Sequence, residues 1–114
     1  TFTILDREPG TGGLQVMGND GQWADAPWVE GAFTINIGDL MMRWSGDRWL
    51  SNRHRVLAPS EQAPDEDLMS LVYFHEADPR AVVRSVPPPI GRVDHPAVTS
   101  GDYLRAKLAA IAVL

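Results

Sequence analysis

Alternating apolar and polar positions predict a series of short β-strands along this chain. Residues 1–5 begin the pattern, with Phe2 and Ile4 on one face and two threonines on the other. Glycine, proline, asparagine and aspartate cluster between the strand-like segments, as expected for turns. Further strands are predicted over residues 14–17, 22–26, 32–38, 50–58, 68–74 and 81–86. The GNDG sequence at residues 18–21 predicts a tight hairpin, because these residue types tolerate positive φ.

Two helices complete the predicted elements. Asp39 is expected to cap a short helix over residues 40–44, and Ser100 is expected to cap a longer amphipathic helix near the C-terminus. The apolar positions of the longer helix are Tyr103, Leu104, Leu108 and Ile111. Many short strands with one terminal helix predict a mainly-β protein. The pattern alone does not choose among a jelly roll, a Greek-key sandwich and a closed barrel.

The predicted strand over residues 50–58 carries the main candidate for chemistry. Its mostly apolar face consists of Leu50, Asn52, His54, Val56 and Ala58. Arg53 and Arg55 lie on the other face, because side chains alternate along a strand. Neutral imidazole is a common ligand of Fe, Zn and Cu. From this strand alone, His54 is either a metal ligand or a buried histidine satisfied by hydrogen bonds.

Several spaced motifs surround that strand. They are Asn36-Ile37-Gly38-Asp39, Arg43-Trp44, Asp47-Arg48, and Ser51 followed by His54-Arg55-Val56. In this combination the chain resembles the second half of the isopenicillin N synthase-like family, Fe(II)-dependent oxygenases that mostly use 2-oxoglutarate. The likeness covers essentially the whole chain. It implies part of a double-stranded β-helix, the cupin-like jelly roll, with a C-terminal α-helix.

The resemblance also implies a metal site. His54 would be the third protein ligand of Fe(II), in a site of two histidines and one carboxylate that leaves positions open for 2-oxoglutarate and O₂. In the family the other two ligands come from an H-x-D motif just before the first strand, and neither His54, His75 nor His95 begins such a motif. We therefore expect residues 1–114 to be the C-terminal part of one Fe(II)/2-oxoglutarate dioxygenase domain. The missing N-terminal half of its own chain would supply H-x-D, and the segment alone would be inactive.

The family's R-x-S motif binds the distal carboxylate of 2-oxoglutarate, and here the matching triplet is Leu68-Met69-Ser70. The resemblance thus implies Ser70 as a cofactor-binding residue but leaves the arginine unmatched. Arg84 is the nearest arginine on the next predicted strand. Three hypotheses follow. The complete protein hydroxylates, desaturates or cyclises a small metabolite with 2-oxoglutarate; it is an iron oxidase of the same family without a 2-oxo acid; or it is a non-catalytic jelly-roll binding module.

Composition narrows the partners. Fifteen Asp and Glu against ten Lys and Arg give a net charge of −5, which argues against a nucleic-acid partner. No run approaches 18 apolar residues, so no membrane partner is expected. The absence of cysteine excludes disulfide and thiolate chemistry, and we expect a cytoplasmic protein. The acidic residues 59–67 lack the spacing of a calcium loop. The expected partners are a small-molecule substrate and O₂.

Overall fold

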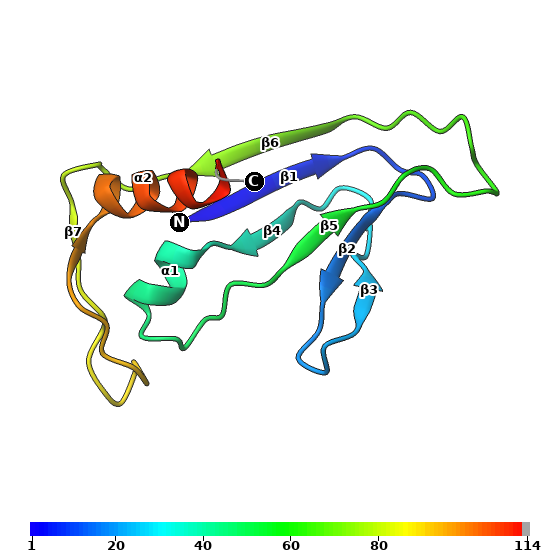
Figure 1. The fold of residues 1–114 in the computed structure, drawn as a ribbon. Coiled ribbons are helices and arrows are strands. Elements are labelled where there is room, and N and C mark those ends of the chain that lie inside the picture. The colour runs from blue at the N-terminus through cyan, green and yellow to red at the C-terminus, as the bar shows by residue number, and fades with distance from the viewer. Residues whose placement is uncertain (113–114) are drawn as a thin grey trace. The chain divides into compact units, whose positions relative to one another are not determined.

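A computed structural model describes residues 1–112 (Figure 1). The chain divides into two compact units. We call the first the strand unit; it comprises Thr3–Asn36 and Asn52–Phe74. We call the second the helix unit; it comprises Thr1–Phe2, Ile37–Ser51 and the chain from His75 onward. Each unit is thus assembled from segments that are distant in sequence.

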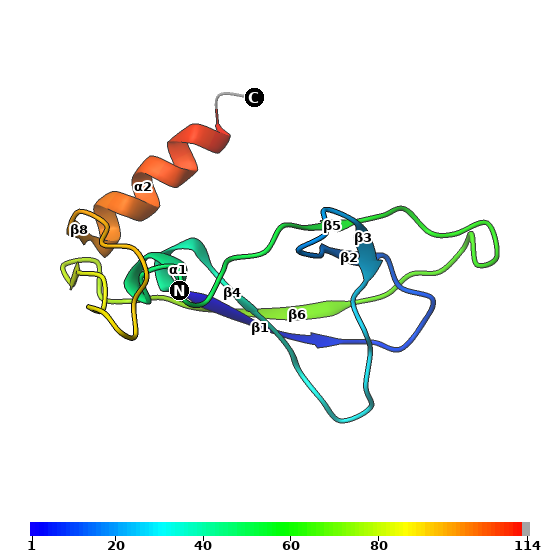
Figure 2. The same ribbon diagram turned by 90° about the horizontal axis from the view of Figure 1, so that it is seen from below.

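Six strands, which lie almost entirely in the strand unit, form two three-stranded sheets. One sheet has the order β4-β1-β6 and is built from β1 (Phe2–Arg7), β4 (Thr34–Ile37) and β6 (Ser70–His75). The other has the order β3-β2-β5 and is built from β2 (Leu14–Met17), β3 (Trp23–Asp25) and β5 (His54–Val56). Figure 2 shows the two sheets as separate layers. The prediction of a mainly-β fold is confirmed.

Strand β2 pairs with both of its neighbours in antiparallel fashion. In the predicted hairpin with β3, Met17 lies opposite Trp23, and Gly21 takes the positive φ of 75° that the turn requires. On its other edge β2 places Val16 opposite His54. This register fixes which face of β5 each side chain occupies.

Strands β1 and β6 run antiparallel in the other sheet (Figure 1). The Glu8 N–H donates to the Met69 carbonyl over 3.2 Å, and the Met69 N–H donates to Glu8 Oε2 over 2.7 Å. In an antiparallel pair this bond puts Arg7 directly across from Ser70. Side chains so placed lie on the same face, with Cβ atoms roughly 5 Å apart.

The helix unit contains α1 (Asp39–Trp44), α2 (Ser100–Ile111) and a two-stranded ladder of β7 (Val82–Val83) and β8 (Val98–Thr99). Its apolar centre is Leu40 of α1 and Val83 of β7, which are the buried hydrophobic residues of the described chain. An ion pair of 2.9 Å between Asp39 Oδ2 and Lys107 Nζ joins α1 to α2. None of the helices in residues 1–112 is long and apolar enough to cross a membrane.

Both predicted helix caps are wrong by one residue. Gly38 is the N-cap of α1 and makes no side-chain cap bond, and Asp39 lies inside the helix. Its carboxylate pairs with Lys107 instead. In α2 the N-cap is Thr99, whose hydroxyl accepts the Asp102 N–H over 3.3 Å. The predicted cap, Ser100, is buried in the first turn.

Two predicted strands are much shorter in the structure. Residues 50–58 contribute only the three residues of β5, because the ladder with β2 ends at those three pairs. Residues 81–86 contribute only the two residues of β7. Strand β6 is longer than β5 and β7, but all six of its residues are exposed, including Leu71 at 64% and Phe74 at 64%. A strand with apolar side chains exposed on both faces is normally covered by other structure.

Candidate functional site in the strand unit

A cavity of about 600 Å³ lies in the strand unit, and each of the six strands contributes to its wall. This volume is in the usual range for small-molecule sites. Its lining from the β4-β1-β6 sheet is Asn36, Thr3, Leu5, Arg7, Ser70, Val72 and Phe74. These residues follow the period of two, so one face of each strand forms the wall. The opposite wall includes Leu14, Asp25, His54 and Val56.

His54 enters the cavity from β5, as its alternation with Arg55 predicts. His54 and Val56 both line the cavity. On the other face, the Arg55 guanidinium donates to Gln15 Oε1 from Nε over 2.9 Å and from Nη2 over 2.7 Å, and it lies 4.2 Å from the Trp23 ring centroid. The imidazole of His54 is exposed and makes no hydrogen bond or ion pair within residues 1–112. Within residues 1–112 this side chain is therefore not satisfied by hydrogen bonds, and its role as a metal ligand stays a prediction.

Ser70 and Leu68 lie on the same side of the cavity. Both line it, as residues two positions apart on an extended chain should. Gly10 gives the Leu68 side chain its room, because a Cβ at Gly10 would stand 2.7 Å from Leu68 Cδ1. An apolar side chain thus occupies the position at which the R-x-S motif places its cation. Arg84 is exposed in the helix unit and is not among the residues that line the cavity.

Arg7 is the cavity residue that the sequence analysis missed. It ends β1 and lies across from Ser70. Its Nη2 donates to the Ala26 carbonyl over 3.2 Å, while its own carbonyl accepts the Trp28 Nε1–H over 2.8 Å. Its Nη1 is buried and has no hydrogen-bond partner among the described residues. The signal was present in the alternation of Thr3, Leu5 and Arg7, but the pairing of β1 with β6 was not known.

The two carboxylates of the cavity wall are already engaged. Glu8 accepts the Met69 N–H, and Asp25 Oδ1 accepts the Gln15 amide over 2.9 Å. Neither forms an ion pair with Arg7 in the described part of the chain. No three histidine or acidic side chains within residues 1–112 come together as a metal site. The donors present therefore fit one ligand position of a site of two histidines and one carboxylate, through His54.

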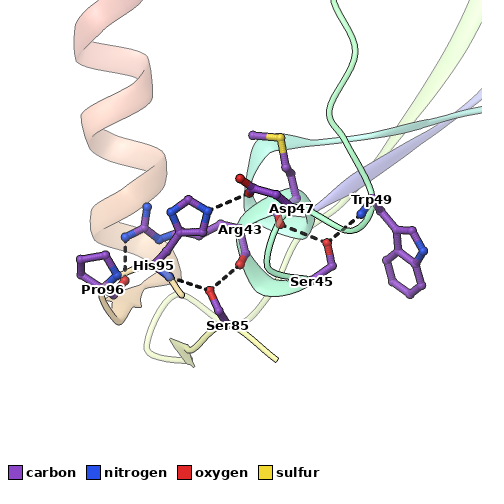
Figure 3. A network of polar contacts seen from close by, with 8 residues as sticks. Arg43, Ser45, Asp47, Trp49, Ser85, His95 and Pro96 are labelled. Atoms are coloured by element: carbon purple, nitrogen blue, oxygen red, sulfur yellow. Dashed lines mark hydrogen bonds and ion pairs between the residues drawn. The ribbon is translucent and has the colours of Figure 1, made fainter. Parts of the chain in front are cut away.

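Two motif residues of the helix unit, Arg43 and Asp47, belong to a polar network rather than to the cavity (Figure 3). Arg43 Nη2 donates to the Pro96 carbonyl over 2.6 Å, and Ser85 Oγ donates to the Arg43 carbonyl over 2.9 Å. The His95 N–H donates to Ser85 Oγ, and His95 Nε2 lies 2.7 Å from Asp47 Oδ1. Two elements of the spaced motifs, Arg43 and Asp47, thus hold the loop after β7 against α1.

The remaining histidine also lies outside the cavity. His75 belongs to the helix unit, where its ring stacks on Phe2 with a centroid separation of 4.7 Å. Its carbonyl accepts a hydrogen bond from the Thr1 hydroxyl. Of the three histidines, His54 is therefore the one that the fold directs toward the cavity.

Comparison with known proteins assigns the family. The model of the 2OG-Fe(II) oxygenase superfamily matches residues 1–77, which include all six strands around the cavity. The chain belongs to this superfamily. The resemblance found in the sequence is thereby confirmed. The predicted cofactors, Fe(II) and 2-oxoglutarate, agree with those that name the 2OG-Fe(II) oxygenases.

Relatives among 2OG-Fe(II) oxygenases match most of this chain but extend well beyond it. Validamycin A dioxygenase of Streptomyces hygroscopicus subsp. limoneus is 46% identical over 108 residues, covering 94% of this chain and 30% of that protein. Gibberellin 2-beta-dioxygenase 4 of Arabidopsis thaliana is 40% identical over 73 residues, covering 66% of this chain and 21% of that protein. The chain spans less than a third of the length of these relatives.

Solved structures confirm the fold. A full-length Neurospora crassa protein in complex with alpha-KG and thymine superposes with a TM-score of 0.80 at 32% identity, covering 97% of this chain and 34% of that one. The same Neurospora protein in complex with alpha-KG alone gives a TM-score of 0.77 at 31% identity, covering 96% of this chain and 34% of that one. Such oxygenases have the jelly-roll fold, as predicted for this chain.

Proposed function

We propose that the complete protein is an Fe(II)- and 2-oxoglutarate-dependent dioxygenase that oxidises a small-molecule substrate with O₂. One observation carries the proposal: an imidazole without a partner, that of His54, lines the same cavity as Ser70 inside the segment that matches the superfamily. Residues 1–114 would be the C-terminal part of one oxygenase domain, and the reaction would hydroxylate, desaturate or cyclise a small metabolite.

In this proposal His54 is one of three protein ligands of Fe(II). The other two would come from an H-x-D motif elsewhere in the chain of the complete protein, because no metal cluster occurs among residues 1–112. Bound iron with 2-oxoglutarate would supply the oxidising power for a C–H bond, with release of CO₂ and succinate. A ring nitrogen of His54 would provide the lone pair, and the exposure of the side chain leaves the ring accessible.

The other cavity residues would bind and shield the co-substrate. Ser70 would donate a hydrogen bond from its hydroxyl to a carboxylate oxygen. Val56, Val72 and Phe74 would exclude water from its carbon chain. The exposed faces of β6 would be covered by the rest of the oxygenase domain, which would close the cavity.

Leu68 supports a second candidate function, an iron oxidase of the same superfamily that uses no 2-oxo acid. The distal carboxylate of 2-oxoglutarate loses hydration when it enters an apolar pocket, and an unpaired charge there is costly. The two candidates differ in one product. Only the 2-oxoglutarate enzyme releases succinate in step with substrate oxidation. A cytoplasmic location stays a prediction for either candidate.

The test of the main proposal is His54→Ala in the complete protein. We expect the variant to lose bound Fe(II) and turnover while its fold is kept. The measurements are metal content per chain after anaerobic loading and desalting, succinate release, and the far-ultraviolet circular dichroism spectrum. His95→Ala and His75→Ala are matched controls from the helix unit, and both should retain iron.

Retention of iron in His54→Ala with its loss in His75→Ala would show that the wrong histidine was chosen. A wild-type protein that binds iron and oxidises its substrate without making succinate would replace the main proposal by the iron oxidase. His95→Ala is expected to lower the melting temperature, because it removes the 2.7 Å contact with Asp47, without a change in metal content.

A further inference from the structure

The position of Leu68 leaves a specific chemical problem in the cavity. A 2-oxoglutarate molecule has two carboxylates, and one of them must lie away from the metal. Ser70 offers that carboxylate only a neutral hydrogen bond, which is weaker than one from a charged donor. A cation near Ser70 is therefore needed if 2-oxoglutarate binds in this cavity.

Arg7 is the arginine of the cavity wall, and its guanidinium is incompletely satisfied. Nη2 donates to the Ala26 carbonyl, whereas Nη1 is buried without a partner among the described residues. A buried guanidinium nitrogen with no acceptor is unusual, because native proteins pair nearly all buried polar groups. Because Arg7 lines the cavity, an anionic ligand there would provide the acceptor after a small rotation of the guanidinium.

The acidic residues nearby do not provide it. Glu8 follows Arg7 directly in sequence, but one of its carboxylate oxygens accepts the Met69 N–H over 2.7 Å. Asp25 accepts from Gln15 on β2. No ion pair to Arg7 forms in the part of the chain that the structure describes. The guanidinium is thus the group that would draw an anion to this end of the cavity.

We propose that Arg7 binds the distal carboxylate of 2-oxoglutarate, together with Ser70, in place of the arginine that Leu68 replaces. The inference rests on the proposed function. Arg7 lies across from Ser70 on the adjacent strand, so both side chains reach the same end of one cavity wall. Guanidinium is also suited to the task, because it presents a planar fork of donors to a carboxylate and stays charged at any working pH.

The two ends of 2-oxoglutarate should depend differently on Arg7. Arg7 should recognise the distal carboxylate and have no effect on the 2-oxo acid end. A matched pair of ligands tests this: 2-oxoglutarate, and 2-oxopentanoate, which has a methyl group where 2-oxoglutarate has its distal carboxylate. Their affinities can be measured by calorimetric titration of the complete protein under anaerobic conditions with Mn(II), so that no turnover is needed.

We expect Arg7→Met to raise the dissociation constant of 2-oxoglutarate ten- to hundredfold, equivalent to about 1.4–2.7 kcal/mol. The affinity for 2-oxopentanoate should change less than twofold, which would also show that the cavity and metal site remain folded. The dissociation constant of 2-oxoglutarate for Arg7→Lys should lie between those of wild type and Arg7→Met. Arg55→Met is the matched control: it removes a hydrogen-bonded guanidinium from the outer face of β5 and should leave both affinities unchanged.

Equal weakening of both ligands by Arg7→Met and by Arg7→Lys would overturn the inference, because it would show a general effect on the site. Unchanged 2-oxoglutarate affinity in Arg7→Met would overturn it as well, and would assign Nη1 to a partner in another part of the protein or on the substrate. Both results leave the proposed function standing. A wild-type protein that binds no 2-oxoglutarate would overturn the proposed function and this inference together.

Discussion

If Arg7 supplies the charge that Leu68 does not, the cation can be moved between the two positions. We predict that Leu68→Arg restores 2-oxoglutarate binding in an Arg7→Met background. Leu68 and Arg7 line the same cavity, and Leu68 is the diagonal neighbour of Arg7 across the β1–β6 pair. A guanidinium on either residue can therefore reach a carboxylate at Ser70.

The magnitude follows from the contact that is regained. A hydrogen bond to a charged group contributes about 1.5–3 kcal/mol. Leu68→Arg should thus recover roughly a ten- to hundredfold gain in 2-oxoglutarate affinity over Arg7→Met alone. Glu66 is a competing partner beside Leu68, but its carboxylate already accepts bonds from Thr11 and Gly12.

In the wild-type background Leu68→Arg should increase the affinity for 2-oxoglutarate much less. The carboxylate already has Arg7, and two guanidinium groups about 7 Å apart repel by roughly 2 kcal/mol at an effective dielectric constant of 20. That repulsion should turn the new side chain away from the cavity, toward solvent. We expect a gain in 2-oxoglutarate affinity of less than about fivefold, so the two substitutions should couple by at least about twofold, equivalent to roughly 0.4 kcal/mol or more.

The assay is the anaerobic Mn(II) titration with 2-oxoglutarate, applied to wild type, both single variants and the double variant. A tenfold or larger gain from Leu68→Arg in wild type, with the same gain in Arg7→Met, would refute the reasoning. That additivity would mean that the carboxylate has no cation in the natural protein and that Arg7 faces something else.

Two further predictions concern the helix unit and are measured as free energies of unfolding of the complete protein. Thr99→Ala should lower the free energy of unfolding by about 1 kcal/mol, because it removes the N-cap of α2. This loss should exceed the loss caused by Ser100→Ala. The hydrogen bond from Ser51, and then that from Lys107, hold the pKa of Asp39 below its usual value. A lowered pKa in the folded state gives stability that is present above about pH 4 and lost as the pH falls. Asp39→Asn should therefore lower the free energy of unfolding at neutral pH, by at most about 1 kcal/mol for a pair this exposed, and should have no effect in acid. A loss of stability that persists in acid would contradict the assignment.

The sequence predicted best those features that depend on neighbours in the chain. Alternation placed His54 on the face opposite Arg55, and the cavity wall confirms it. The GNDG turn predicted the β2–β3 hairpin because the turn and both strands are contiguous. The family motifs then supplied the jelly roll, which alternation alone did not distinguish from other β architectures.

The features that the sequence did not predict correctly depend on contacts between distant segments. Asp39 resembles a cap in sequence, but Lys107 from α2 pairs with its carboxylate. Arg7 resembles a surface residue at the end of a strand. Its place in the cavity depends on the bond from Glu8 to Met69, which are 61 residues apart. Such a register cannot be predicted from either strand by itself, because a shift of one residue would reverse every side chain.

If Arg7 binds the distal carboxylate as proposed, this dependence on register also explains how the site can lack the motif arginine and still bind 2-oxoglutarate. A carboxylate requires a positive charge within reach and does not require that the charge come from one particular backbone position. Across the β1–β6 pair, the ends of two neighbouring strands offer positions on the same wall, at Leu68 and at Arg7. The long side chain of arginine covers the difference between them. In that case an arginine at one strand takes the place of an arginine at the other, and the charge is present in the cavity although the sequence lacks the R-x-S motif.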